Sequence, residues 1–495
     1  MGLSVTRDDF SDEDIAAFSA QVRDQLDVLK HLLEQPGFGE GPSSLGAELE
    51  YYLIDQDLNP LPRNQEVLQA LDDPQFTVEL NRFNLEYNLT PHPFSDQPFA
   101  AMEADLERAL ERIDAAAGPL GGRAVPIGIL PTLSPRHFNG STMTDLPRYR
   151  ALARALRGLR GAPFEIHIDG AVPLDFIKED VTLEGANTSF QVHWRVEPRN
   201  FAAHFNAVQL MTPLAVALGA NSPSLFGHLL WDETRIALFK QAIDSRAMRD
   251  VGWHEPPRVS FGEGWARLGA WELFAESLAL YPPLLPVIDQ DDPWQAVRSG
   301  TCPALNALRL HQGTTWPWNR AVFDPASGGH LRIEMRALPS GPTPADMSAN
   351  ALFLIGGALA LIPHIDHLTA ILPFRYAEQN FYRAAKFGID ASLIWPASNG
   401  VELRERPILE IARELLPQIR EALGQTALAE REIGRLLDLI QGRIDGRVTP
   451  ARWQRRWVEH FQRTLSPDEA FRAMLSRYLE NQEGRKPLCE WSLAP

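Results

Sequence analysis

Alternating apolar and polar residues, typical of strands with one buried face, recur along the first 340 residues. They predict strands over Ser43–Asp55, Phe76–Leu89, Ser189–Glu197 and His330–Leu338, and the apolar run Arg123–Leu133 predicts another. Apolar stretches with helix start and stop residues predict helices over Asp12–Gln35, Pro98–Ala117, Leu146–Gly161, Asn200–Ala220 and Pro344–Ile362. Strands and helices do not alternate regularly. The pattern therefore favours an α+β fold, with a curved, mainly antiparallel sheet and helices on its outer face.

The pattern changes near residue 400. Amphipathic helices rich in Arg, Glu and Leu are predicted over Glu402–Leu423, Leu428–Ile444, Pro450–Leu465 and Pro467–Gln482. The stretch Trp395–Asn399 is predicted to be the linker before them. The sequence thus predicts an N-terminal helix in residues 1–40, a sheet-containing domain in residues 41–395 and a helical C-terminal region in residues 400–495.

The first predicted strand carries two glutamates on one face. Glu48 and Glu50 alternate with Leu49 and Tyr51, so both carboxylates point the same way. Adjacent carboxylates repel each other unless water or a cation neutralises them, and hard cations such as Mg²⁺ prefer oxygen ligands. An edge strand with two solvated glutamates would show the same pattern. This strand alone does not decide between the two.

The second predicted strand favours a site. Asn84, Glu86 and Asn88 share one face, opposite Leu85 and Tyr87. Solvated strand faces more often carry Lys, Thr or Arg. Glu79 falls on the opposite parity from Glu86 in a regular strand, unless a bulge intervenes.

Two further strands repeat this arrangement. Gln191, His193 and Arg195 share one face of the third strand. On the fourth, the polar face carries Arg332, Glu334 and Arg336. Interleaved Arg and Glu could form a plain cross-strand ladder of salt bridges, or a metal-binding glutamate between phosphate-binding arginines. Taken together, the polar faces predict a groove that holds cations and phosphates.

Composition narrows the partners. The net charge of −17 disfavours nucleic acid and anionic membranes as partners. The chain has two cysteines, Cys302 and Cys489, which form no metal-binding or disulfide pattern. The N-terminus resembles no signal peptide, and the apolar run Ala349–Pro363 is too short to span a bilayer. We expect a cytoplasmic protein.

Several stretches, in this order, resemble the second glutamate–cysteine ligase family, carboxylate–amine ligases of glutamine synthetase-like fold. They include GAELEYYLID at 46–55, ELNRFNLEYNLTP at 79–91, GILPTLSP at 128–135, SFQVHWRVEP at 189–198, ALGANSPSLFGHLLWDETRIALF at 217–239 and HLRIEMRALPSGPTPADMSANALF at 330–353. The resemblance spans about residues 46–355, most of the predicted domain in residues 41–395, which it implies is the catalytic domain of glutamine synthetase-like fold; the helices after about 400 fall outside it. The chain departs from the family pattern at Gln191, where the family more commonly has histidine.

The resemblance also implies roles for individual residues. The metal ligands would be Glu48, Glu50, Glu86, His193 and Glu334. Gln191, Arg332 and Arg336 would bind the nucleotide, with the choice between nucleotide and metal left open for Gln191. The catalytic arginines would be Arg336, Arg235 and, as a weaker candidate, Arg320.

The implied reaction uses ATP and Mg²⁺. ATP would phosphorylate a substrate carboxylate, and an amine would attack the resulting acyl phosphate. The favoured substrates are glutamate and cysteine, which would give γ-glutamylcysteine for glutathione biosynthesis. Another amino acid, a peptide or a small amine could replace cysteine. A nucleotide-binding regulatory protein without turnover is the alternative of another class. Whether the chain forms a homodimer stays open.

Overall fold

The computed structural model describes residues 5–247, 255–397 and 400–492. At its centre lies an eight-stranded sheet in the order β12-β13-β9-β1-β3-β2, with β4 and β6 also paired to β1. All of these pairings are antiparallel. The strands are β1 (Ser44–Asp55), β2 (Phe76–Val78), β3 (Asn84–Asn88), β4 (His92–Pro93), β6 (Gly122–Val125), β9 (Phe190–Val196), β12 (Asn319–Asp324) and β13 (His330–Met335).

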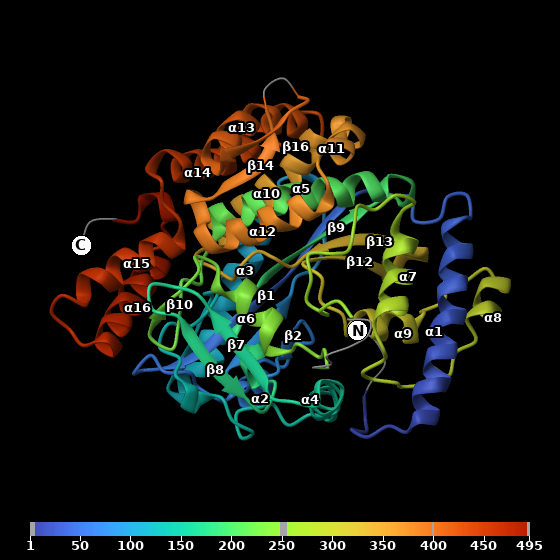
Figure 1. Ribbon diagram of the computed structural model, residues 1–495, viewed down its shortest axis with the longest axis horizontal. Coiled ribbons are helices and arrows are strands. Elements are labelled where there is room, and N and C mark those ends of the chain that lie inside the picture. The colour runs from blue at the N-terminus through green and yellow to red at the C-terminus, as the bar shows by residue number, and fades with distance from the viewer. Residues whose placement is uncertain (1–4, 248–254, 398–399, 493–495) are drawn as a thin grey trace.

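Helices surround this sheet, and the predicted α+β class with a curved antiparallel sheet is confirmed (Figure 1). Those before the C-terminal region are α1 (Asp12–Leu33), α2 (Asn64–Leu71), α3 (Pro98–Ala117), α4 (Pro147–Arg160), α5 (Phe201–Gly219), α6 (Thr234–Ala242), α7 (Ala270–Leu280), α8 (Pro293–Arg298), α9 (Asn306–Gln312), α10 (Pro344–Leu361), α11 (Ile365–Ile371) and α12 (Phe374–Phe387). Small strand pairs are β7 (Phe164–Ile168) with β8 (Leu174–Lys178), β10 (Ser224–Leu225) with β11 (His228–Leu229), and β5 (Ser95–Asp96) with β16 (Ala427–Leu428).

The helices α5 and α10 form the core beneath the sheet. They pack against each other, and α3 packs against both α10 and the sheet. The ring of Trp194 on β9 lies 5.0 Å from that of His204 on α5, measured between centroids. Both long helices are apolar enough to cross a membrane by length and composition, but most of each apolar window is buried inside the protein. Burial in the core accounts for their composition.

The predicted strand Phe76–Leu89 is wrong as a continuous element, because it is a hairpin of β2 and β3. The chain turns between them, and buried side chains satisfy the polar groups of the turn. The Asn64 side-chain amide donates to the carbonyl oxygens of Asn81 and Asn84. Asn81 in turn donates to the carbonyl of Thr182. These amides replace the ladder partners that a straight strand would have had.

Other boundaries also differ from the prediction. The apolar run Arg123–Leu133 forms only the short strand β6, since Pro126 and Pro131 cannot donate to a ladder. Strand β12 was not predicted. The predicted linker Trp395–Asn399 overlaps β14 (Ser392–Pro396), which pairs with β15 (Leu403–Pro407); residues 398–399 lie outside the described residues.

The C-terminal helices join the same core. They are α13 (Ile408–Gly424), α14 (Glu430–Gly446), α15 (Pro450–Phe461) and α16 (Pro467–Glu483). Because β15 takes up its first residues, α13 begins later than predicted. Both α13 and α14 pack against α10. Arg443 of α14 is fully buried and forms an ion pair of 2.7 Å with the buried Asp346 of α10.

This buried ion pair gives a test of the packing. Arg443→Ala leaves the Asp346 carboxylate buried without its cation, so we expect a loss of about 3–5 kcal/mol in the free energy of unfolding. The exposed Arg431 on the same helix is the control, and Arg431→Ala should change it by less than about 0.5 kcal/mol. Urea unfolding measures both. Equal effects of the two substitutions would contradict this account of the contact.

Candidate active site

Antiparallel register brings the predicted polar faces together. Glu334 on β13 lies opposite His193 on β9, and on its other side opposite Arg320 on β12. Across β1 and β3, Glu50 lies opposite Glu86. Glu48 lies opposite Gln191 on β9 and opposite Asn88 on β3. Neighbouring strands therefore place these side chains in one continuous patch.

The first cluster in this patch consists of Glu48, His193 and Glu334. One ligand atom from each lies within 4.8 Å of the others. The imidazole Nε2 of His193 lies 3.3 Å from a carboxylate oxygen of Glu48. Even so, neither ring nitrogen of this buried histidine has a hydrogen-bond partner among the described residues. A buried imidazole without a hydrogen bond, beside two carboxylates, suits a bound divalent cation.

Two arginines hold Glu334. Arg320 binds it in a bidentate ion pair, with distances of 2.7 and 3.0 Å. Arg336 donates to the same carboxylate at 2.5 Å. Burial alone would raise the pKa of Glu334, but Arg320 and Arg336, joined by His193, outweigh it and hold the pKa well below its ordinary value. Glu334 is therefore ionised although it is buried.

The second cluster consists of Glu50, Glu79 and Glu86, again with one carboxylate oxygen of each within 4.8 Å of the others. Burial raises the pKa of all three carboxyl groups, and mutual repulsion raises those of Glu79 and Glu86 further. The pKa of Glu86 rises to about 8. No arginine or lysine forms an ion pair with any of them in the described part of the chain. This cluster therefore has a stronger need for an added cation than the first.

Glu79 is a candidate metal ligand that the sequence analysis did not predict. In a straight strand it would point away from Glu86, and the hairpin between β2 and β3 brings it back to the same cluster. The sequence did contain a signal for the turn that places Glu79 in this cluster. The Asn81-Arg82-Phe83-Asn84 stretch has a polar start typical of a turn, and a turn there removes the parity argument.

Glu48 of the first cluster and all three residues of the second line a cavity of about 510 Å³, whereas His193 and Glu334 are not among its lining residues. Its walls include Arg148 and Tyr149 of α4 and Trp316 of the segment before β12. Glu184, another lining residue, has a pKa raised to about 8 by burial, with a smaller contribution from Glu50. This volume lies within the range of about 300–1,000 Å³ that is usual for ligand pockets, so the cavity has room for a ligand of nucleotide size.

Gln191 links the two clusters. Its side-chain nitrogen donates to Glu50 at 3.2 Å, and its side-chain oxygen accepts a hydrogen bond from Arg336. Glu50 also accepts a hydrogen bond of 2.6 Å from the backbone N–H of Ser189. In this structure, both ends of the Gln191 amide are therefore used to orient neighbouring side chains.

The other two predicted arginines lie elsewhere. Arg235 at the start of α6 is fully buried; it pairs with Glu233 at 2.9 Å and donates to the carbonyl of Ala337. Arg332 on β13 forms an ion pair of 3.3 Å with Asp324. Neither lines the cavity, whereas Arg320 and Arg336 do.

Comparison with known proteins gives matches of very different extent. The model of the family "Glutamate-cysteine ligase family 2" matches residues 44–463. A threonine–tRNA ligase of Novosphingobium aromaticivorans is 30% identical over 94 residues, which are 18% of this chain and 13% of that protein. The chain thus matches only a small part of the length of this curated relative.

Solved structures resemble the fold. A glutamate–cysteine ligase from Francisella tularensis, in complex with AMP, aligns with a TM-score of 0.52 at 12% identity, over 92% of this chain and 90% of that one. A bifunctional glutathione synthetase from Pasteurella multocida aligns with a TM-score of 0.47 at 11% identity, over 93% of this chain and 55% of that one.

The family match extends well beyond the motifs. It covers the sheet, both carboxylate clusters and the C-terminal helices as far as residue 463. The expectation that the helices after about residue 400 lie outside the family pattern is therefore wrong for α13, α14 and α15, whereas α16 lies beyond the matched residues. With most of its length matched, the chain belongs to glutamate–cysteine ligase family 2.

Proposed function

We propose that this protein is an ATP- and Mg²⁺-dependent ligase that joins the side-chain carboxylate of glutamate to an amine, with cysteine the favoured acceptor. The observation that supports this most is the pair of clusters of candidate metal ligands, Glu48-His193-Glu334 and Glu50-Glu79-Glu86, of which Glu48 and the whole second cluster line the cavity. The donor set fits divalent cations, because it is mainly carboxylate oxygen and one buried imidazole lacks a hydrogen bond.

Bound Mg²⁺ would neutralise the polyphosphate of ATP, and these clusters are the residues that would hold it. Arg336 and Arg320 lie beside the Glu334 end of the cavity and supply fixed positive charge. Burial alone would lower the pKa of Arg336, but the neighbouring Glu334, Glu48 and Glu50 raise it, so the guanidinium stays charged. In a site with little water, such charges stabilise the equatorial oxygens of a transferring phosphoryl group.

The proposed chemistry has two steps. A carboxylate oxygen of glutamate attacks the γ-phosphorus of ATP, and the bond to ADP breaks. The neutral amine then attacks the acyl carbon; phosphate leaves, and the amine loses a proton as the amide forms. No protein nucleophile is needed, so the chain's task is to position the substrates and balance their charge. We place the enzyme in the cytoplasm, with small-molecule substrates.

The acceptor is tested with a panel of amines. We expect the purified chain, with ATP, Mg²⁺ and glutamate, to release ADP and phosphate when cysteine is added, and to form γ-glutamylcysteine detectable by mass spectrometry. Release with a different amine alone would replace cysteine as the acceptor and keep the reaction class. Absence of ADP release with every amine would contradict the ligase proposal and favour a nucleotide-binding regulatory protein.

Glu79 gives the sharpest test of the second cluster. Glu79→Gln removes one of three repelling carboxylates, so the metal-free protein should become more stable to heat. The same change removes a proposed ligand, so Mg²⁺ affinity, measured by calorimetry, should fall by roughly 10- to 100-fold.

The matched control is Glu421→Gln on the exposed face of α13, which should leave stability and Mg²⁺ affinity unchanged. If Glu79→Gln binds Mg²⁺ as tightly as the unaltered protein, Glu79 is not a ligand.

Metal-free stability should depend on pH with a defined sign. The pKa of Glu86 is about 8 in the folded chain, against an ordinary value of 4.5. Between these values the folded state binds more protons than the unfolded state, so stability should fall as pH rises from about 4.5 to 8. Saturating Mg²⁺ favours the ionised carboxylates and should weaken that fall. Thermal melts across this range, with and without Mg²⁺, measure the effect; stability that rises with pH without metal would contradict it.

A further inference from the structure

A second, smaller cavity lies on the other side of Arg320. Its walls are the last turns of α7, the segment 260–264, the middle of α5 and the start of β12. Arg320 lines both cavities, so the two are neighbours at the edge strand of the sheet. The proposed ligase reaction assigns no role to this second cavity.

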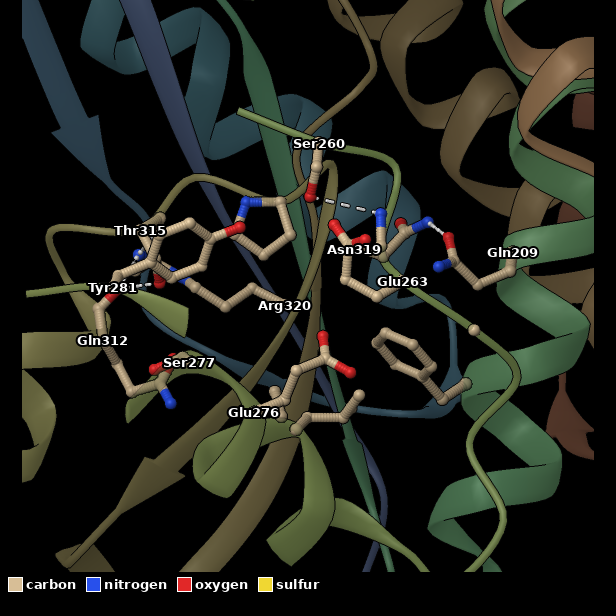
Figure 2. A pocket seen from close by; sticks show the side chains of 16 residues that line it. Gln209, Ser260, Glu263, Glu276, Ser277, Tyr281, Gln312, Thr315, Asn319 and Arg320 are labelled. Carbon is tan, nitrogen blue, oxygen red and sulfur yellow. Dashed lines mark hydrogen bonds between the residues drawn. The ribbon is translucent and has the colours of Figure 1, made fainter. Parts of the chain in front are cut away.

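Two carboxylates enter this cavity without a cation. Figure 2 shows Glu276 projecting from α7 toward the middle of the pocket, with Glu263 on the opposite side. Neither makes a hydrogen bond or an ion pair within the residues that the structure describes. Arg320 is the one arginine or lysine among the described lining residues, and Glu334 already holds it in a bidentate pair. Neither carboxylate therefore has a cation in direct contact, and Lys240 and Arg267 offset the charges of Glu263 and Glu276 only in part.

The pKa of Glu276 reflects the absence of a cation in contact with its carboxylate. Burial raises it to about 7, and repulsion from Glu263 and Glu272 adds to the rise, against a smaller opposing effect of Arg267. Burial also raises the pKa of Glu263, although its side chain is exposed at the mouth of the cavity. A positively charged ligand between the two would reverse both effects.

Buried polar atoms without partners supply a second, independent observation. Asn319, Ser277 and Gln312 line this cavity, and one polar atom of each (Oδ1, Oγ and Nε2), with almost no accessible surface, makes no hydrogen bond within the described residues. Their residues are only 1%, 7% and 8% exposed. Buried polar atoms are rarely left unpaired, because each costs about 1–3 kcal/mol. After a side-chain rotation toward the cavity, two of them would accept a hydrogen bond from an ammonium group, and Gln312 would donate one to a polar tail.

The remaining lining favours an organic ligand over a bare ion. Phe205, Leu273 and Tyr281 provide apolar and aromatic surface around the carboxylates. A carbon skeleton can pack on this surface while a charged end reaches Glu263 and Glu276. A ligand carboxylate, in contrast, would meet two like charges and no free cation.

We propose that this second cavity binds a small molecule with a primary ammonium group and no carboxylate beside it. The binding itself does not depend on the ligase reaction. Its use as the acceptor site does rest on the proposed function, and it would make a carboxylate-free amine the acceptor in place of cysteine. The same chemistry would also suit an amine that regulates the enzyme without being consumed.

Binding is measured by calorimetry on the full chain without ATP, at pH 8, where Glu276 is mostly ionised. The probes are cysteamine and ethanolamine, with cysteine and ethylene glycol as their carboxylate-bearing and uncharged counterparts. We expect both amines to bind at millimolar concentration or below, cysteine to bind more weakly than cysteamine, and ethylene glycol not to bind. Absence of binding by both amines, or tighter binding of cysteine, overturns the proposal.

The variants locate the bound amine. Glu276→Gln and Glu263→Gln should each weaken cysteamine binding by roughly tenfold or more. Glu421→Gln, the same chemical change on an exposed helix face, should not weaken it. Should Glu276→Gln fail to fold, Glu263→Gln at the mouth of the cavity still tests the site. Unchanged affinity in the folded variants overturns the proposal.

A final arm separates acceptor from effector. With ATP, Mg²⁺ and glutamate present, a γ-glutamyl amide of cysteamine identifies an acceptor site, and this amide should be lost in Glu276→Gln. A changed rate with cysteine but no cysteamine product identifies a regulatory amine. If no amine supports ADP release, the ligase proposal fails while the calorimetric result stands by itself.

Discussion

Repulsion between carboxylates on one face of the sheet is the constraint on which the rest of the site depends. Antiparallel pairing places Glu48, Glu50, Glu86 and Glu334 on neighbouring strands, and the hairpin adds Glu79. Such a concentration of negative charge is unfavourable in a buried place unless cations offset it. Arg320 and Arg336 provide that compensation at Glu334, and the cluster around Glu79 has no equivalent. We propose that a bound cation completes this arrangement.

The core explains how the sheet tolerates this face. The opposite faces of β1, β9 and β13 carry apolar side chains that are almost fully buried, such as Leu49, Val192 and Ile333. A one-residue slip in register would turn these toward the cavity and the glutamates toward the core, at a large cost. Packing of α5 and α10 beneath the sheet therefore holds the carboxylates in place, although neither helix supplies a member of the two clusters.

Much of the cavity wall could be predicted from strand parity. The two-residue repeat of a strand is enough to predict that Glu48 and Glu50 share a face, and the structure confirms this prediction. The same repeat places Arg332 and Glu334 on one face of β13, with Arg336 just after it. Strand parity gave a wrong prediction where the chain does not continue as a strand. Glu79 was assigned to the wrong face because local alternation cannot show that a buried network around Asn64 and Asn81 bends the chain into a hairpin.

Other features depended on contacts between distant parts of the sequence. Arg332 shares its strand face with Glu334, yet it pairs with Asp324 away from the cavity, which only the pairing of β12 with β13 reveals. The second cavity joins side chains from α5, α7 and β12, separated by about 100 residues of chain. Neither periodicity nor motif spacing carries such information, and the acid-lined pocket could not have been foreseen from the sequence.

The central claim is that the two carboxylate clusters hold divalent cations against the phosphates of a nucleotide. Anomalous diffraction from crystals of the full chain grown with Mn²⁺ and ADP tests this most directly. We expect one anomalous peak bordered by Glu48, His193 and Glu334 and a second bordered by Glu50, Glu79 and Glu86, both next to phosphate density. Bound ADP with no Mn²⁺ at either cluster would contradict the account.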